Sequence, residues 1–191
     1  IACPKALQVF NGDNEWTMRM QARSQAKQIV FSSFKATADV HMRAQKMDWN
    51  GLDLIGRLRG AEGRAQVRVL GRHNVVNLMC ASALALAVDL TPAQIWQGLN
   101  QINDTAWGRN QLVGLKNGAK ILFDAYNANP DSVQALFKNL YEFEGAGRKF
   151  LVMGDMRELG TFSEQAHEEA GERAASIAFE AVYFVGEFSK S

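Results

Sequence analysis

The stretch FDAYNANPDS (Phe123–Ser132) joins two sequence patterns and decides how the second half of this chain folds. The run AKILF before it (119–123) is short and apolar, which predicts a buried strand. Asn129, Pro130 and Asp131 then form a helix-start signal: an N-cap, a proline at the first helical position and an acid in the first turn. The sequence therefore predicts a strand that ends in a polar loop and continues as a helix.

The same alternation continues towards the C-terminus. RKFLVMGDM (148–156) and EAVYFVGEF (180–188) have strand patterns, and SEQAHEEAGERAASIAF (163–179) between them has a helix pattern. Apolar strands that alternate with helices are typical of a parallel sheet covered on both faces, so we expect a parallel α/β domain here. Because three strands are few for such a sheet, we expect the domain to be truncated.

The first half of the chain has a different pattern. We expect residues 1–70 to form short strands and turns, including a small antiparallel sheet with turn signals at Asn50-Gly51 and GAEG (60–63); the β-rich runs are QIVFSS (28–33), DVHMRAQKMDW (39–49), GLDLIGRL (51–58) and AQVRVL (65–70). Apolar residues at helical spacing predict a buried helix over 73–90, and Thr91-Pro92 opens a second helix. The polar segment 103–108 predicts a boundary between domains 1–106 and 107–191.

Composition restricts the class of protein. The 191 residues are 47% hydrophobic and 21% charged, with a net charge of +1, which provides no strong field for nucleic acid or a membrane surface. No apolar run approaches the ~20 residues that span a bilayer, and the first residues do not resemble a signal peptide. Cys3 and Cys80 form no metal-binding spacing or disulfide framework, which indicates a reducing compartment. The chain does not begin with Met, so we expect a piece of a longer protein.

Polar side chains follow two of the predicted parallel strands. Asp124, Tyr126, Asn127 and Asn129 follow the first; Asp155 and Glu158, in MGDMRELG (153–160), follow the next. Ligands of open parallel sheets bind beyond the carboxyl ends of the strands. An Asp there can accept both ribose hydroxyls, and an amide can bind a phosphate oxygen. Alternatively the loop only starts the helix, with Asn129 as its cap and Asp124 bound to backbone amides.

Two further groups of residues could bind an anionic ligand. GRHNVVN (71–77) places Arg72, His73, Asn74 and Asn77 at a predicted helix start, where free backbone amides favour anions and an Asn amide matches the adenine edge. The alternative is that His73 or Asn74 only caps the helix. Arg109 follows the predicted boundary and is either a solvated charge or a ligand of a transferring phosphoryl group. No GxxxxGK[ST] or GxGxxG sequence occurs in the chain.

Together GRHNVVN, WGRN (107–110), FDAYNANPDS and VMGDMRELG (152–160) resemble the Mur ligases, the ATP-dependent amide ligases of peptidoglycan precursor synthesis. FNGDNEW (10–16) is similar to the Asn-x-Asp-Asp/Asn turn of that family. The YNANP and GDM-x-ELG forms are similar to members that join D-alanyl-D-alanine to UDP-N-acetylmuramoyl-tripeptide. The resemblance implies that residues 1–106 are the end of a central ATPase domain, and that 107–191 begin a Rossmann-like C-terminal domain.

The resemblance also implies roles for individual residues. ATP and Mg²⁺ are the implied cofactors, with ATP contacted by Asn77, Arg109, Asp124 and Asn127, and with His73 and Asn74 in the same motif. Arg109 is implied to be catalytic, near the γ-phosphate. Asn129, Ser132, Asp155 and Glu158 are implied to lie on the D-alanyl-D-alanine side. The resemblance further implies a cytoplasmic monomer that binds no nucleic acid, inserts into no membrane and holds no metal on residues of this chain.

The sequence departs from the family pattern in two places. The P-loop and the carbamylated lysine that holds magnesium in this family are absent from these 191 residues, so we expect the isolated chain to be inactive. Asn110 and Gln111 follow Arg109, where the family more often has Leu or Met. Two alternatives stay open: a related ligase of the folylpolyglutamate or cyanophycin type, and a non-catalytic nucleotide-binding or interaction module of the same fold.

Overall fold

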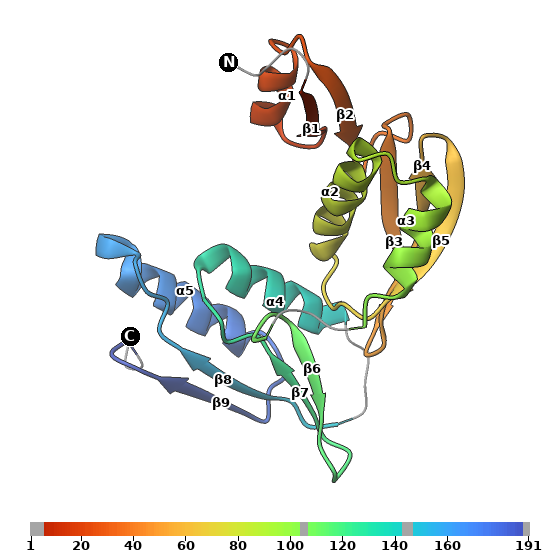
Figure 1. Ribbon diagram of the computed structural model, residues 1–191. Helices are drawn as coiled ribbons and strands as arrows, with labels where there is room; N and C mark the ends of the chain where they lie inside the picture. Colours follow the sequence, from red (N-terminus) through yellow and green to blue (C-terminus); the bar gives the residue numbers. More distant parts are fainter. Residues whose placement is uncertain (1–5, 104–106, 143–146, 189–191) are drawn as a thin grey trace. The chain divides into compact units, whose positions relative to one another are not determined.

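The computed structural model describes residues 6–103, 107–142 and 147–188 (Figure 1). The chain divides into two compact units, residues 1–105 and 106–191, which are described separately below. The boundary predicted between residues 106 and 107 adjoins residues 104–106, which lie outside the described residues. No helix in the described ranges is long and apolar enough to cross a bilayer.

The first unit contains a five-stranded sheet in the order β1-β2-β3-β4-β5, formed by Leu7–Asn11, Lys27–Phe31, Val40–Asp48, Gly51–Leu58 and Ala61–Val67. The predicted antiparallel sheet is confirmed for β3, β4 and β5. β1 pairs with β2 in parallel, and β2 meets β3 in parallel at Phe31 and Val40. Figure 1 shows this sheet in red to yellow. The unit is therefore mixed rather than purely antiparallel.

Both predicted hairpins exist, but the second turn lies elsewhere. Asp48 pairs with Gly51, so the first loop is Trp49–Asn50, next to the expected Asn-Gly signal. Leu58 pairs with Ala61, so the second loop is Arg59–Gly60 and β5 begins at Ala61. Both loop residues have positive φ, 47° and 82°, as a tight hairpin turn requires. The turn predicted over 60–63, and the strand predicted over 65–70, were therefore placed too far along the chain.

Helix α1 (Glu15–Gln21) contradicts the prediction that residues 1–70 contain only strands and turns. The side chain of Asn14 caps it by accepting hydrogen bonds from the backbone N–H groups of Trp16 and Thr17. The neighbouring Asp13 carboxylate binds the hydroxyls of Ser32 and Ser33. Burial raises the pKa of Asp13, but the bonds from the two serines lower it by more, so it lies below 3.8. FNGDNEW thus joins β1 to α1 and ties that junction to the end of β2.

The two helices predicted after the sheet are confirmed. α2 (Asn74–Ala87) buries Leu78, Met79 and Leu86 and packs on β1, β2 and β3. α3 (Pro92–Asn100) packs on β5, and Thr91 and Gln94 form a reciprocal capping box at its start. Cys80, in α2, is a free thiol.

The second unit follows the predicted strand-helix order, with one additional strand. β7 (Lys120–Phe123), α4 (Pro130–Glu142), β8 (Phe150–Gly154), α5 (Ser163–Ala175) and β9 (Ala181–Val185) match the expected pattern, and a 3₁₀ turn (Gly160–Phe162) precedes α5. The additional strand β6 (Gln111–Gly114) pairs antiparallel with β7, while β8 pairs in parallel with β9. Within the described residues β7 and β8 do not pair, so the expected continuous parallel sheet is two two-stranded sheets.

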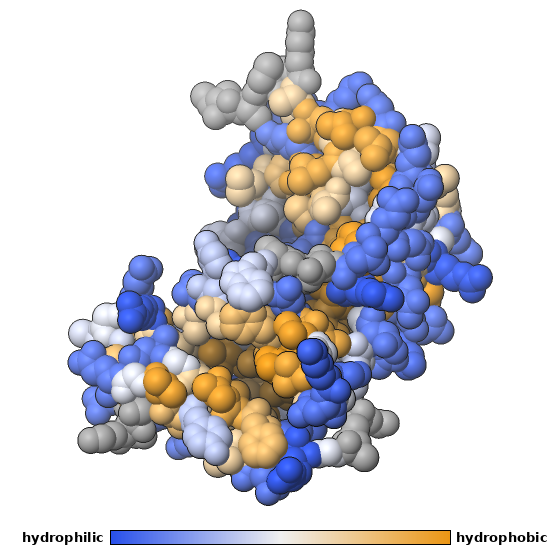
Figure 2. Space-filling model, turned by 60° about the horizontal axis from the view of Figure 1, so that its bottom comes forward, coloured by the Kyte–Doolittle hydropathy of each residue, from blue (hydrophilic) through white to orange (hydrophobic). Residues whose placement is uncertain are grey.

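The β8–β9 sheet is covered on one face. Leu151 and Met153 are buried in one cluster with Val133 and Phe137 of α4 and Ala170 of α5. The opposite face exposes large side chains, with relative exposures of 53% for Phe150, 72% for Val152, 56% for Tyr183 and 62% for Val185. Figure 2 shows apolar surface of this kind in orange in the lower part of the view. The expected cover on both faces is therefore wrong for the described residues.

Candidate functional site

The loop between β7 and α4 contains Asp124, Tyr126, Asn127 and Asn129 of the residues expected at the site. Oδ1 of Asp124 accepts a hydrogen bond from the backbone N–H of Asn110 at 3.1 Å. The backbone N–H of Tyr126 donates to the carbonyl of Gly108 at 3.0 Å. Segment 108–110, with Arg109 in its middle, is therefore attached to the loop on both sides. Sequence spacing gave no sign of this attachment, because 14 residues separate Asn110 from Asp124.

Arg109 and Tyr126 are in direct contact. The guanidinium carbon lies 4.2 Å from the centroid of the Tyr126 ring, within the range of a cation–π interaction. Nearby, the rings of Trp107 and Phe123 meet at a centroid distance of 4.9 Å. The structure thus brings together the WGRN and FDAYNANPDS motifs through residue pairs that are 14 or more positions apart in the sequence.

The helix-start interpretation of Asn129 is confirmed. Its Oδ1 accepts a hydrogen bond from the backbone N–H of Ser132 at 2.8 Å, and the Ser132 hydroxyl accepts one from the Asn129 N–H at 3.0 Å. The two side chains therefore cap the start of α4 reciprocally. Val133, four positions after Asn129, lines the hollow described next. Asn127 also binds backbone, since its Oδ1 accepts from the N–H of Ala128 at 3.0 Å.

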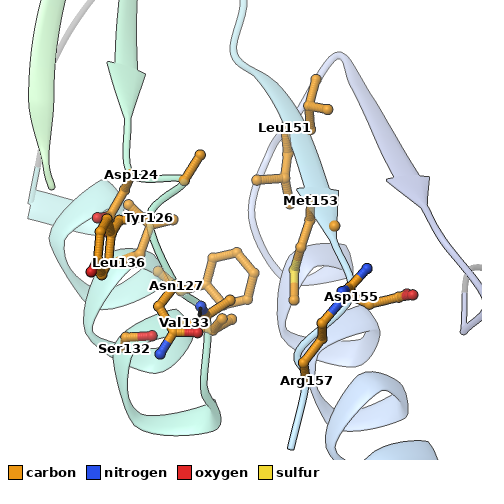
Figure 3. A pocket seen from close by; sticks show the side chains of 15 residues that line it. Asp124, Tyr126, Asn127, Ser132, Val133, Leu136, Leu151, Met153, Asp155 and Arg157 are labelled. Atoms are coloured by element: carbon orange, nitrogen blue, oxygen red, sulfur yellow. Dashed lines mark hydrogen bonds between the residues drawn. The ribbon is translucent and has the colours of Figure 1, made fainter. Parts of the chain in front are cut away.

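A hollow of about 330 Å³ lies beyond the ends of β7 and β8 and along the edge of β8 (Figure 3). Its polar lining combines Asp124, Asn127 and Ser132 from the β7–α4 side with Asp155 from the loop after β8. Val133, Phe137, Leu151 and Met153 supply apolar lining. With Tyr126, the structure therefore gathers five of the sequence-predicted residues around one space, whereas Arg109, Asn129 and Glu158 are not in its lining.

Arg157 also lines this hollow, although sequence reasoning assigned it no role. Its exposed side chain lies on the β8 side of the space in Figure 3, together with Asp155. The signal that could have found it is its position inside MGDMRELG, between two residues that were singled out. Glu158, the next residue, is exposed and has a positive φ of 64°.

Asp155 joins the ends of β8 and β9. Its carboxylate accepts hydrogen bonds from the backbone N–H groups of Glu187 at 2.9 Å and Phe188 at 3.3 Å. The bond from Glu187, with that from Phe188 and the charge of Arg157, lowers the pKa of Asp155 below 3.8 despite desolvation. Gly186 permits this approach, because a Cβ there would lie 2.1 Å from the carboxylate. Asp155 therefore has a structural role within the unit.

His167, to which the sequence assigned no chemistry, supports the same loop. It is buried, and its Nε2 accepts a hydrogen bond from the backbone N–H of Met156 at 2.9 Å. Its Nδ1 lies 2.6 Å from the carbonyl of Ser163, and its ring stacks on Phe188. The loop between Asp155 and Glu158 is thus fixed to α5 and to the end of β9.

In the first unit the expected residues gather at the start of α2. Nδ2 of Asn74 donates to the carbonyl of Leu70 at 2.7 Å, and Nδ2 of Asn77 donates to Oδ1 of Asn74 at 2.9 Å. Asn77 is exposed, so its position inside an apolar helix does not bury it. His73 makes no side-chain cap to α2, so the cap interpretation of His73 is wrong. Arg72 donates to the carbonyl of Ala44.

The donor sets differ in what they could bind. Considered separately, the exposed amide at the start of α2 and the carboxylate after β7 each have polar atoms of the kind that bind a nucleotide. Among the described residues, no group of three His, Cys, Asp or Glu side chains could hold a metal ion.

Protein-family models match both units. The Mur ligase middle domain matches residues 3–85, and the Mur ligase glutamate ligase domain matches residues 108–191. The chain belongs to the Mur ligase family. This Mur ligase chain is 30% identical over 182 residues to UDP-N-acetylmuramoyl-tripeptide–D-alanyl-D-alanine ligase of Escherichia coli K12, which covers 95% of the chain and 40% of that relative.

Two further proteins are similar to this Mur ligase chain. The Bacillus subtilis ligase of the same name is 38% identical over 114 residues, covering 60% of the chain and 25% of that relative. A crystal structure of MurF from Acinetobacter baumannii superposes with a TM-score of 0.85 at 26% identity, covering 97% of the chain and 39% of that protein. The Mur ligase chain therefore spans 40% or less of the length of these three proteins.

Proposed function

We propose that this chain is part of an ATP-dependent ligase that joins D-alanyl-D-alanine to UDP-N-acetylmuramoyl-tripeptide. Residues 1–106 are the C-terminal part of its central ATP-binding domain, and residues 107–191 are the first part of its C-terminal domain. The observation that carries the proposal is the hollow beyond β7 and β8, whose polar lining comes from FDAYNANPDS and GDMRELG. The two relatives named as this ligase support the choice of substrates.

Asp124 and Asn77 are the residues that we assign to the nucleoside. Asp124 uses Oδ1 for the Asn110 N–H, and its Oδ2 has no hydrogen-bond partner within the described residues, so it is available to a ribose hydroxyl. Asn77 donates through Nδ2, while its Oδ1 has no partner in the same part of the chain and suits the exocyclic amine of adenine. His73, Asn74 and Asn127 belong to the same two motifs and complete the proposed nucleotide-binding set.

Arg109 is the residue that we assign to the transferring phosphoryl group. ATP supplies that group to the terminal carboxylate of the tripeptide, which becomes an acyl phosphate. Negative charge accumulates on the phosphoryl oxygens during transfer, and a guanidinium stabilises it with several N–H donors. Within the described residues Arg109 makes no salt bridge, so this charge is not neutralised there.

The amine of D-alanyl-D-alanine then attacks the acyl carbonyl, loses a proton, and phosphate leaves as the tetrahedral intermediate collapses. Ser132 and Asp155 line the hollow on the side that we assign to this dipeptide. Asn129 lies three positions before Ser132, and Glu158 lies three positions after Asp155. Asn129, Ser132 and Asp155 contribute to that side indirectly, because their side chains hydrogen-bond the backbone and hold the two loops in place. We assign Mg²⁺, the second implied cofactor, to no residue of this chain.

The test uses the complete protein that carries this chain, purified and supplied with ATP, Mg²⁺ and UDP-N-acetylmuramoyl-tripeptide. D-Alanyl-D-alanine, D-glutamate and a diamino acid are offered separately as amine donors, and the product is measured by mass spectrometry. We expect ligation and phosphate release with D-alanyl-D-alanine alone. Ligation of glutamate or of the diamino acid to this acceptor, without reaction of D-alanyl-D-alanine, would overturn the proposal in favour of a related ligase.

A further inference from the structure

The Tyr126 ring holds the guanidinium of Arg109 in a particular way. The contact is with the face of the ring, at 4.2 Å. A carboxylate in the same place would occupy the N–H donors of the guanidinium, whereas an aromatic face attracts the cation and leaves those donors at its edge free. Arg109 is in no salt bridge with any described residue, so its donors stay available for a ligand.

The backbone on both sides of this contact is fixed. The carbonyl of Gly108 accepts the N–H of Tyr126, and the N–H of Asn110 donates to Asp124. Gly108 has a φ of 71°, and a Cβ there would lie 3.1 Å from the backbone nitrogen of Tyr126, so the turn lies directly on the loop. The remaining freedom of Arg109 is therefore in its side chain, whose many rotamers must be restricted to orient the guanidinium.

We propose that Tyr126 is a positioning residue, which orients the guanidinium of Arg109 for the transferring phosphoryl group before substrates bind. The inference rests on the function proposed above, since it gives Arg109 its target. Tyr126 is 68% exposed, so its ring fills no core and its removal opens no cavity. The aromatic face, and not the phenol hydroxyl, is the active feature, because no hydrogen bond of that hydroxyl occurs among the described residues.

The first test measures kinetics of the complete ligase with Tyr126→Phe, which keeps the ring, and Tyr126→Leu, which removes it. We expect Tyr126→Phe to keep kcat within about two-fold, and Tyr126→Leu to lower it about ten-fold with KM values for ATP and dipeptide nearly unchanged. In an Arg109→Gln background, which lacks the cation, the same Leu substitution should cost less than about two-fold. An unchanged kcat in Tyr126→Leu, or an equal loss in both backgrounds, overturns the proposal.

The second test examines the contact without turnover. In protein labelled with isotopes in arginine, stacking shifts the Arg109 Hδ and Hε resonances upfield, and the Arg109→Lys spectrum assigns them. We expect the shift in the wild type and in Tyr126→Phe and its loss in Tyr126→Leu; no shift in the wild type overturns the inference. If the wild type makes no product, the proposed function fails, and this spectrum still decides whether Tyr126 orients Arg109.

Discussion

Oδ1 of Asp124 accepts a hydrogen bond from the backbone N–H of Asn110 at 3.1 Å. This bond joins the end of β7 to the residue that follows Arg109, while the second carboxylate oxygen has no hydrogen-bond partner within the described residues. The Asp124 side chain thus fixes the backbone next to Arg109, the proposed ligand of the phosphoryl group, and keeps one oxygen available to the nucleoside. The structural and functional interpretations of Asp124 are therefore compatible.

Replacement of Asp124 separates these two roles. In the complete ligase, Asp124→Ala should weaken ADP binding about ten-fold, because a hydrogen bond to a charged group is lost, and calorimetry measures this affinity. Asp124→Asn keeps an acceptor for the Asn110 N–H and serves as the matched control, with a smaller loss. Unchanged affinity in Asp124→Ala would leave Asp124 with its structural role alone.

The Asp155 junction should depend on pH. Its pKa is lowered in the folded chain, so its contribution to stability is complete above 3.8 and is lost as the pH falls through the folded value. The amide resonances of Glu187 and Phe188 should therefore move together in acid, followed by NMR from about pH 7 to about pH 2. In Asp155→Ala the two amides should show no shared acid transition. If the transition persisted in that variant, a group other than Asp155 would be its cause.

Replacing Gly63 or Gly98 with alanine should change the free energy of unfolding in opposite directions. A Cβ at Gly63 would lie 2.1 Å from Nε1 of Trp96, which is only 8% exposed, so Gly63→Ala should lower the free energy of unfolding by about 1–3 kcal/mol. Gly98 lies inside α3 with nothing within 4 Å of its Cβ position. Gly98→Ala should raise that free energy by about 0.5–1 kcal/mol. Chemical denaturation measures both, and equal effects would contradict the packing of Trp96 on β5.

The Asn129 cap of α4 should also contribute to the free energy of unfolding. Asn129→Ala removes the acceptor of the Ser132 N–H and should cost about 1 kcal/mol in free energy of unfolding, measured by denaturation. Asn129→Ser preserves a capping oxygen and should be close to the wild type. If the Ala and Ser variants were equally stable, the reciprocal cap would contribute nothing measurable.

Local patterns predicted the helices and most strands because their signals lie within a few residues. The apolar period of 73–90, the Thr91-Pro92 cap and the Asn129-Pro130 start all lead to observed helices. α1 was missed because its seven residues bury no side chain and so carry no apolar stripe. β6 was missed because a four-residue edge strand has too few positions to show alternation.

The positions of these polar residues after the strands were predictable from the sequence, but their contacts were not. Asp124 and Asp155 follow strands, which placed them at the carboxyl ends. The pairing of Arg109 with Tyr126, and of Asp155 with the Glu187 N–H, depends on tertiary packing across 17 and 32 residues of sequence, which local patterns do not encode. The unpaired edges of β7 and β8 likewise follow from strand order rather than from the pattern of either strand.

The central claim is that the protein carrying this chain activates a carboxylate as an acyl phosphate and transfers it to D-alanyl-D-alanine. The most direct measurement supplies UDP-N-acetylmuramoyl-tripeptide with ¹⁸O in its terminal carboxylate and examines the released phosphate by mass spectrometry. We predict that phosphate formed together with the ligated product carries a single ¹⁸O from the carboxylate. Phosphate without ¹⁸O, formed at the same rate as the product, would contradict the account.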